Sequence, residues 1–219
     1  MDSKMINIII EALGQTIYMV FFSTLFASVL GFILGIIVTV TSPTGLRPNI
    51  FIYKSLDVII NVLRSFPFII LIVFIIPLTR AIVGTPIGET AAIVPLTIAA
   101  APFVARIIES ALKEVDPGVI EAAKSFGASN LQIIFKVMLK EAVPAIVSGI
   151  TLSLISIIGY SAMAGFTGGG GLGDIAIRYG YHRYQTDMMM VTVVLLVIIV
   201  QLIQEVAMRM SRKSDKRIR

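Results

Sequence analysis

The sequence predicts an all-α membrane protein with five transmembrane helices and a short cytoplasmic helix between the third and the fourth. Of the 219 residues, 57% are hydrophobic and only 14% are charged, and the mean hydropathy is +0.95. A soluble domain carries about 25% charged residues. Five apolar runs are long enough to cross about 30 Å of hydrocarbon at roughly 1.5 Å per residue. We expect residues 1–219 to form a single transmembrane domain.

The composition also excludes several classes of function. The net charge of +5 comes from basic residues at the ends of the spans and in the tail, so nucleic acid is not an expected partner. Without cysteine, and with the single histidine His182, neither a thiolate site nor a histidine cluster for a metal is expected. The N-terminus has no basic start and carries Glu11 before the first long apolar run, so we expect no cleaved signal peptide.

The first span is predicted at residues 16–40. Residues 1–15 are mildly amphipathic, and we expect them to lie along the bilayer surface. Within the span, Ala27, Gly31 and Gly35 are four residues apart, the small-xxx-small spacing that lets membrane helices approach closely. This face is therefore expected to pack against another helix and not to line a pathway.

The second and third spans are predicted at 56–78 and 90–112, with an outer loop between them. The third span contains two prolines and is expected to be kinked. Near its end, Arg106 and Glu109 are three residues apart, a spacing that allows an ion pair on one helical face. We expect this pair to mark the inner membrane interface.

The fourth span, predicted at 143–165, carries a stripe of small and polar residues. Their spacings of four, three, four and three place them on one helical face: Gly149, Ser153, Ser156, Tyr160 and Met163. Such a face packs against another helix or borders a wet cavity, and both hold for a helix near a symmetry axis. We predict that the last four line or gate a pathway; the alternative is that they only pack a dimer interface.

The segment after the fourth span is rich in glycine. Gly168, Gly170 and Gly173 match G-x-G-x-x-G, but no strand precedes them, so a dinucleotide site is excluded. The loop is instead expected to be conformationally free and to bend sharply. The final span is predicted at 188–208, and a basic tail follows it.

The basic residues are distributed unevenly between the two sides of the predicted membrane. The loops at 41–55 and 113–141 and the tail hold twelve: Arg47, Lys54, Lys113, Lys124, Lys136, Lys140, Arg209, Arg212, Lys213, Lys216, Arg217 and Arg219. The other side holds four: Lys4, Arg80, Arg178 and Arg183. By the positive-inside rule, the C-terminus and the loop between spans three and four are cytoplasmic, and the N-terminus is outside.

That cytoplasmic loop is expected to contain a short helix with well-marked ends. The turn signal at 116–118 precedes it, since proline fixes φ and glycine supplies positive φ. Gly127 is suited to the left-handed residue that ends a helix. Ser129 and Gln132 have the spacing of a capping box and predict the start of the next helix. The helix between these signals has a thin face at its two alanines, where another protein's surface can come close.

The segment 121–127, Glu-Ala-Ala followed by three residues and glycine, resembles the EAA motif of type I ABC importer permeases. In that family the loop is a coupling helix that docks into a groove on a cytoplasmic ATPase subunit. The resemblance implies the ATPase-coupling residues Glu121, Ala122, Ala123, Lys124 and Gly127. The match departs downstream, where Lys140 stands at the expected proline and a proline follows only at Pro144.

Three further stretches, at 159–165, 168–174 and 178–181, resemble the methionine-importer permease family. The resemblance implies a bacterial inner-membrane permease that imports methionine, L- or D-, by alternating access. It also implies a second copy of the chain, two cytoplasmic ATPase subunits that bind ATP and magnesium, and an extracytoplasmic substrate-binding protein. The chain has no P-loop, so we expect a non-catalytic subunit without a cofactor of its own.

Two other functions remain open on the sequence alone. An ion- or proton-coupled secondary transporter of small amino acids keeps ionisable residues near mid-membrane, and spans one, four and five have none in their interiors. A membrane assembly factor without a pathway leaves the stripe on the fourth span as simple packing. Co-purification of an ATPase distinguishes the importer from both.

Overall fold

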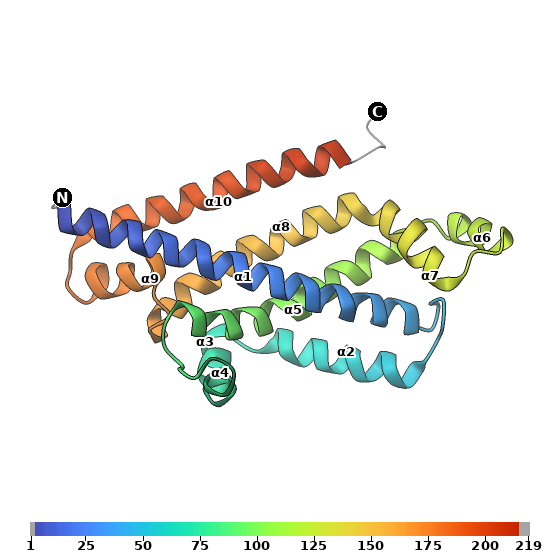
Figure 1. Ribbon diagram of the computed structural model, residues 1–219, viewed down its shortest axis with the longest axis horizontal. Helices are drawn as coiled ribbons and strands as arrows, with labels where there is room; N and C mark the ends of the chain where they lie inside the picture. Colours follow the sequence, from blue (N-terminus) through green and yellow to red (C-terminus); the bar gives the residue numbers. More distant parts are fainter. Residues whose placement is uncertain (1–2, 215–219) are drawn as a thin grey trace.

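The computed structural model describes residues 3–214, and over that range the regular elements are helices (Figure 1). In chain order they are α1 (Ser3–Thr41), α2 (Ile50–Ser65), α3 (Phe68–Phe74), α4 (Ile76–Val83), α5 (Glu89–Lys113), α6 (Pro117–Ser125), α7 (Asn130–Gln132), the π-helical η1 (Ile133–Met138), α8 (Leu139–Ala164), the short η2 (Gly165–Thr167), α9 (Gly171–Ile175), the π-helical η3 (Ala176–Tyr181) and α10 (Thr186–Ser214).

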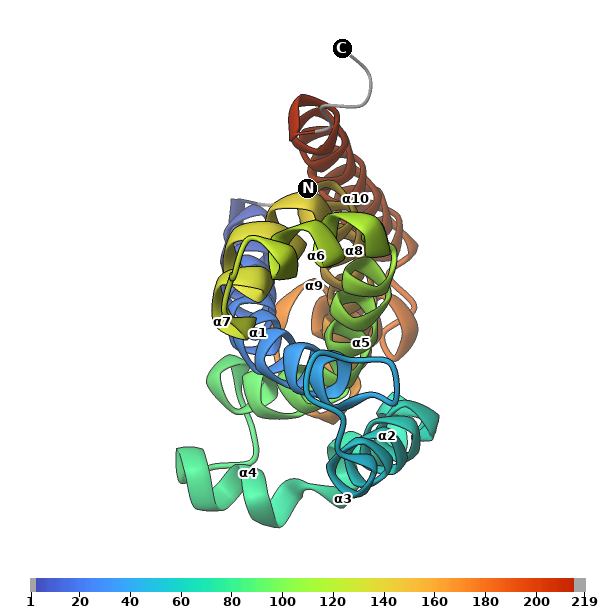
Figure 2. The same cartoon turned by 90° about the vertical axis from the view of Figure 1, so that its right-hand side faces the viewer.

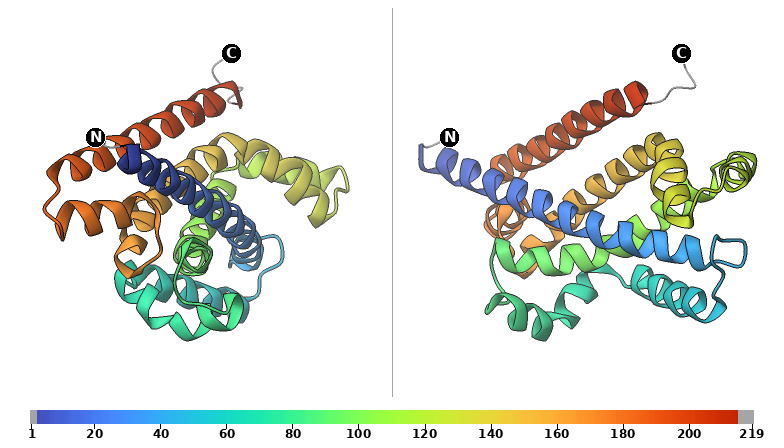
Figure 3. Two further views of the ribbon diagram at one scale, coloured as in Figure 1. Left: turned by 60° about the vertical axis from the view of Figure 1, so that its left-hand side comes forward. Right: turned by 45° about the vertical axis from the view of Figure 1, so that its right-hand side comes forward.

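The predicted fold class, an all-α membrane protein, is confirmed. Four of the described helical segments are long and apolar enough to cross a membrane, and there are five if the bent pair α2–α3 is counted as one span. Helix α5 is the central one, contacting α1, α2, α3, α4 and α8 (Figure 2). Its Leu96, Val104 and Ile108 are fully buried. Helix α10, in contrast, lies at the edge of the bundle (Figure 3). Only 11% of the residues in its most apolar 18-residue stretch are buried.

The expectation that residues 1–15 lie along the bilayer surface is wrong. Helix α1 is continuous from Ser3 to Thr41, because no strong breaker separates the amphipathic start from the span. Part of the apolar surface of that start is covered by protein: Ile9 and Ala12 are buried in a cluster with Leu172 of α9 and Met188 of α10, whereas Ile6 and Ile10 are exposed.

The second predicted span is also not one helix. Pro67 restricts the residue before it to extended conformations, and Phe66 has φ −71° and ψ 126°, so α2 ends at Ser65. Helices α2 and α3 meet at 106°. Thr79, predicted in the outer loop, is buried in α4, which ends at Gly84 with φ +86°.

The third span was predicted closely, since α5 begins at Glu89 and ends at Lys113 with both prolines inside it. The glycine-rich segment bends sharply, as expected, with positive φ at Gly168, Gly170 and Gly171. However, it is held against α1: the Gly171 amide donates to Gln15 Oε1 (2.8 Å) and the Leu172 amide to Thr16 Oγ1 (2.9 Å).

The small-residue face of α1 packs directly on α5, as predicted. A Cβ added at Gly31 would lie 2.5 Å from Cβ of Val104, and one at Gly35 would lie 2.6 Å from Cβ of Ile108. The two helix backbones therefore approach more closely than any side chain at these positions would allow.

This contact predicts opposite effects of the same substitution at two sites in α1. Gly31→Ala should lower the stability of the purified protein by about 1–3 kcal/mol, because the added methyl group overpacks the α1–α5 contact. Gly14→Ala should be neutral or stabilising, because nothing lies within 4 Å of the added Cβ and alanine favours a helix. Thermal unfolding in detergent measures both, and equal midpoints would contradict the prediction.

Candidate functional site

Helix α6 begins where the turn signal predicted. Asp116 is the N-cap, and its Oδ1 accepts a hydrogen bond from the amide of Gly118 (2.7 Å). Pro117 stands at the first helical position, where the missing N–H costs nothing. The start of α6 is thus determined by local chemistry.

The end of α6 also matches the prediction. Gly127 has φ +79°, and its amide donates to the Lys124 carbonyl (2.9 Å). The next helix starts with the expected capping box, in which the Gln132 amide donates to Ser129 Oγ (3.3 Å) and the Ser129 amide to Gln132 Oε1 (2.9 Å). These bonds satisfy backbone groups that helix ends otherwise leave unpaired.

The two faces of α6 differ in what they contact. Ile120 and Ala123 pack inward on a buried cluster that includes Ile133 of η1 and Leu112 of α5. The exposed side presents Val119 and Ala122, and Phe126 follows directly after the helix with 92% of its surface accessible. The two predicted alanines therefore lie on different faces. The exposed side also carries Glu121, Lys124 and Ser125, so it is mixed in character. Sequence reasoning missed Phe126 as its largest apolar residue.

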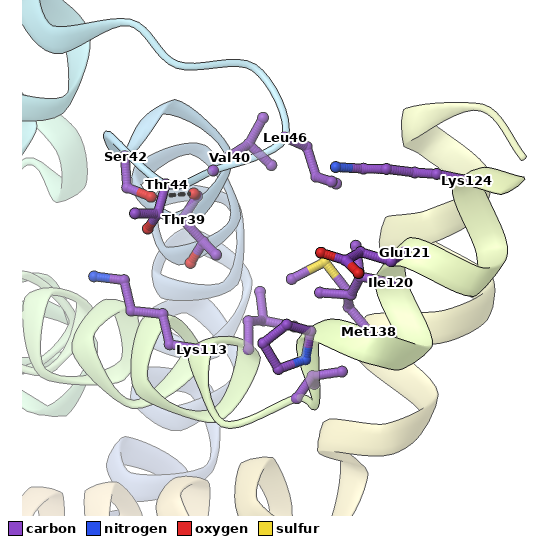
Figure 4. A pocket seen from close by; sticks show the side chains of 14 residues that line it. Thr39, Val40, Ser42, Thr44, Leu46, Lys113, Ile120, Glu121, Lys124 and Met138 are labelled. Carbon is purple, nitrogen blue, oxygen red and sulfur yellow. Dashed lines mark hydrogen bonds between the residues drawn. The ribbon is translucent and has the colours of Figure 1, made fainter.

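A cavity of about 320 Å³ separates α6 from the end of α1 and the loop that follows it (Figure 4). Glu121 and Lys124 line this cavity and are also exposed. Lys113, at the end of α5, lines it from the other side. The remaining lining residues are Thr39, Val40, Ser42, Thr44, Gly45, Leu46, Leu112, Val115, Pro117, Ile120 and Met138.

The exit from this loop does not need a proline at position 140. Helix α7, the π-helical η1 and α8 follow one another without a break, and Pro144 lies inside α8. Because η1 supplies Ile133, Ile134 and Met138 to the cluster beneath α6, the loop is anchored to α8 as well as to α5. The residues beneath α6 therefore belong to the same cluster as residues of α5 and α8.

The predicted gate residues on α8 are in different environments. Ser153 is buried, and Ser156 Oγ donates to the Leu152 carbonyl (3.0 Å). The ring of Tyr160 stacks on Phe68 of α3 with centroids 4.8 Å apart. Half of Met163 is exposed. Of these four, Met163 has the side chain most available to a partner or a pathway.

The predicted ion pair on α5 is present, and it has a partner that the sequence did not reveal. Arg106 Nη1 lies 2.6 Å from Glu109 Oε2. Arg106 Nη2 also pairs with Asp57 of α2. No local spacing relates Asp57 to Arg106, 49 residues away, so only the folded chain brings them together.

The family model described as "Binding-protein-dependent transport system inner membrane component" matches residues 27–219. The chain belongs to this family. The resemblance to ABC importer permeases inferred from the EAA motif is thereby confirmed. The chain is 52% identical to "Probable D-methionine transport system permease protein MetI" of Vibrio cholerae over 96% of its own length and 94% of the relative. It is 46% identical to the Escherichia coli K12 "D-methionine transport system permease protein MetI" over 75% and 76%.

Among solved structures, this family member is similar to a chain of "Inward facing conformations of the MetNI methionine ABC transporter". The TM-score is 0.97 at 45% identity, with 99% of this chain and 100% of that chain covered. A chain of an amino acid ABC transporter has a TM-score of 0.79 at 20% identity and shows the shared fold alone.

The left-handed residue after α6 yields a prediction with a matched control. Gly127→Val should destabilise the end of α6 by roughly 1–3 kcal/mol, because a β-branched residue is strained at positive φ. Gly127→Asn should cost less, since asparagine tolerates this region. A steric clash does not contribute to this cost, because a Cβ added at Gly127 has no atom within 4 Å. Hydrogen exchange of residues 117–125 should quicken in the valine variant and change less in the asparagine variant. Equal protection in the two would contradict the strain argument.

Proposed function

We propose that this chain is the permease subunit of an ATP-driven importer that carries methionine across the bacterial inner membrane. The observation that carries the proposal is the 52% identity, over nearly the whole of both chains, to a relative named as a D-methionine permease. The exposed side of helix α6, with the exposed Phe126 directly after it, supplies the surface through which such a permease is driven.

The proposed assembly contains two copies of this chain, two cytoplasmic ATPase subunits and an extracytoplasmic substrate-binding protein. The similar solved chain comes from a methionine ABC transporter, which supports an ATPase partner. The sequence has no P-loop, so this chain is proposed to be non-catalytic, with ATP and magnesium bound by the ATPase. One α6 per chain suits a two-fold assembly, the commonest closed symmetry.

The proposed orientation places α6 and the C-terminus in the cytoplasm and the N-terminus outside. The twelve-to-four distribution of basic residues supports it. The elements are arranged compatibly: the turn after α1 and helices α6 and α7 lie at one end of the long axis, and α9 lies at the other (Figure 1).

Transport is proposed to proceed by alternating access. ATP closes the ATPase dimer and brings the two α6 helices together, and their displacement moves α5 and α8 through the buried cluster beneath α6. The spans then open outward to accept substrate from the binding protein, and hydrolysis restores the inward state. Ser153, Ser156, Tyr160 and Met163 remain the proposed pathway residues, with Met163 as the gate because half of it is exposed.

The orientation is tested by labelling single cysteines in a chain that has none of its own. Ser125→Cys should react only from the cytoplasm and Thr85→Cys only from outside; both positions are exposed in the structure. The measurement is reaction with a membrane-impermeant maleimide in intact cells and after permeabilisation. Labelling of Ser125→Cys in intact cells would refute the topology.

The substrate and the gate are tested in one reconstituted system containing the permease, its ATPase and the binding protein. The unmodified complex should accumulate labelled methionine, and failure to do so removes the methionine assignment. Met163→Ala should raise the basal ATPase rate several-fold and make it less dependent on binding protein, because shortening an exposed gate residue allows leakage. If Met163 only packs, the change should cost stability and leave the dependence on binding protein as it was.

A further inference from the structure

Helix α2, the first part of the bent pair α2–α3, is weakly packed. Ile60 is its only buried residue, and it joins a small cluster with Val38 of α1 and Ala105 of α5. The sharp break at Phe66–Pro67 separates α2 from α3. Apolar burial of α2 against the rest of the chain is therefore limited to Ile60 and the partly buried Tyr53 and Leu56 around it, which gives its polar contacts more weight.

A polar stripe on α2 provides those contacts. Tyr53, Asp57 and Asn61 are four residues apart and lie on one helical face. Arg106 of α5 reaches this stripe: its Nη2 donates to an Asp57 carboxylate oxygen and to Asn61 Oδ1 (2.9 Å). The same nitrogen lies 3.5 Å from the Asp57 carbonyl oxygen.

The network continues along α5 towards α6. Glu109 is 5% exposed and is held on both oxygens, by Arg106 Nη1 (2.6 Å) and by Lys113 Nζ (2.7 Å). The Lys113 amine lies 5.9 Å from the ring centre of Tyr53, the first residue of the α2 stripe. Lys113 is the last residue of α5 and lines the cavity behind α6. Charges of alternating sign thus run from the end of α5, at the cavity that α6 also lines, to the middle of α2.

We propose that Arg106 is a positioning residue that locks α2 to α5, so that a displacement entering at α6 carries α2 along with α5. The consequence reaches the pathway region, because α3 follows α2 and its Phe68 stacks on Tyr160 of α8. This inference rests on the proposed function, since it specifies how motion from the ATPase reaches the spans.

The chemistry of arginine suits this role. The planar guanidinium directs two nitrogens to two different helices at once, which a lysine ammonium does not reproduce. The Arg106 and Asp57 side chains are both partly shielded from solvent, and their pairing is screened less than a surface pair. Loss of Arg106 leaves Asp57 without a cation in a partly shielded site, which is unfavourable. Loss of Asp57 leaves Arg106 paired with Glu109 of its own helix but no longer with a charge on α2.

The first experiment measures the lock itself, independently of substrate. In the assembled complex, Arg106→Gln and Asp57→Asn should each speed hydrogen exchange in residues 50–65 about tenfold, because α2 opens locally once the lock is lost. The control is Glu205→Gln, which removes an exposed pair with Arg209 inside α10 (2.7 Å) and should leave α2 unchanged. Unchanged exchange in both test variants overturns the proposal.

The second experiment measures transmission, as methionine taken up per ATP hydrolysed in proteoliposomes. Arg106→Gln should lower this ratio at least about fivefold while ATP hydrolysis persists, and Arg106→Lys should restore it only partly. The double variant Asp57→Asn/Arg106→Gln should be no worse than Arg106→Gln, because both changes remove the same contact. Faster exchange in α2 with an unchanged ratio overturns the transmission role. If the unmodified complex takes up no methionine, the proposed function fails, and the exchange experiment still decides whether Arg106 locks α2.

Discussion

The contact on which the remaining structure depends is the close approach of helices to α5. Lipid tails are as apolar as leucine, so helices in a membrane gain little from apolar burial and depend on van der Waals packing and polar contacts. Gly31 and Gly35 bring α1 onto α5 with no room for a side chain. Gly149 does the same for α8, where an added Cβ would lie 2.1 Å from Ile107 Cγ2. Close packing on two sides makes α5 the fixed frame of the subunit.

The frame explains how a short loop helix can act on distant spans. Helix α6 rests on a cluster that contains residues of α5 and η1, so it has no independent core of its own. On the other side of α5, Arg106 bonds to two residues of α2, whose only buried residue is Ile60. Under the proposed function, motion at α6 would reach α8 through packing and α2 through the charges on α5.

Features determined by local chemistry could be predicted from the sequence, and features determined by distant partners could not. The ends of α6 follow from Asp116, Pro117 and Gly127, and all three were identified. The length of α1 was missed because only the folded chain shows what covers Ile9. The break at Pro67 was missed because the apolar run continues across it. At the candidate site, both sides of α6 carry apolar residues, so the exposure of Phe126 needed the structure.

The charge network also bears on the choice between an ATP-driven importer and the proton-coupled transporter that the sequence left open. A proton-coupled transporter needs an intramembrane group that takes up and releases a proton in each cycle. Glu109 is the buried carboxylate of α5, and both of its oxygens are bound by cations of the same helix. These two pairs give Glu109 a structural use, because it joins Arg106 and Lys113 along one face of α5. The buried carboxylate is therefore accounted for without a proton-carrying role.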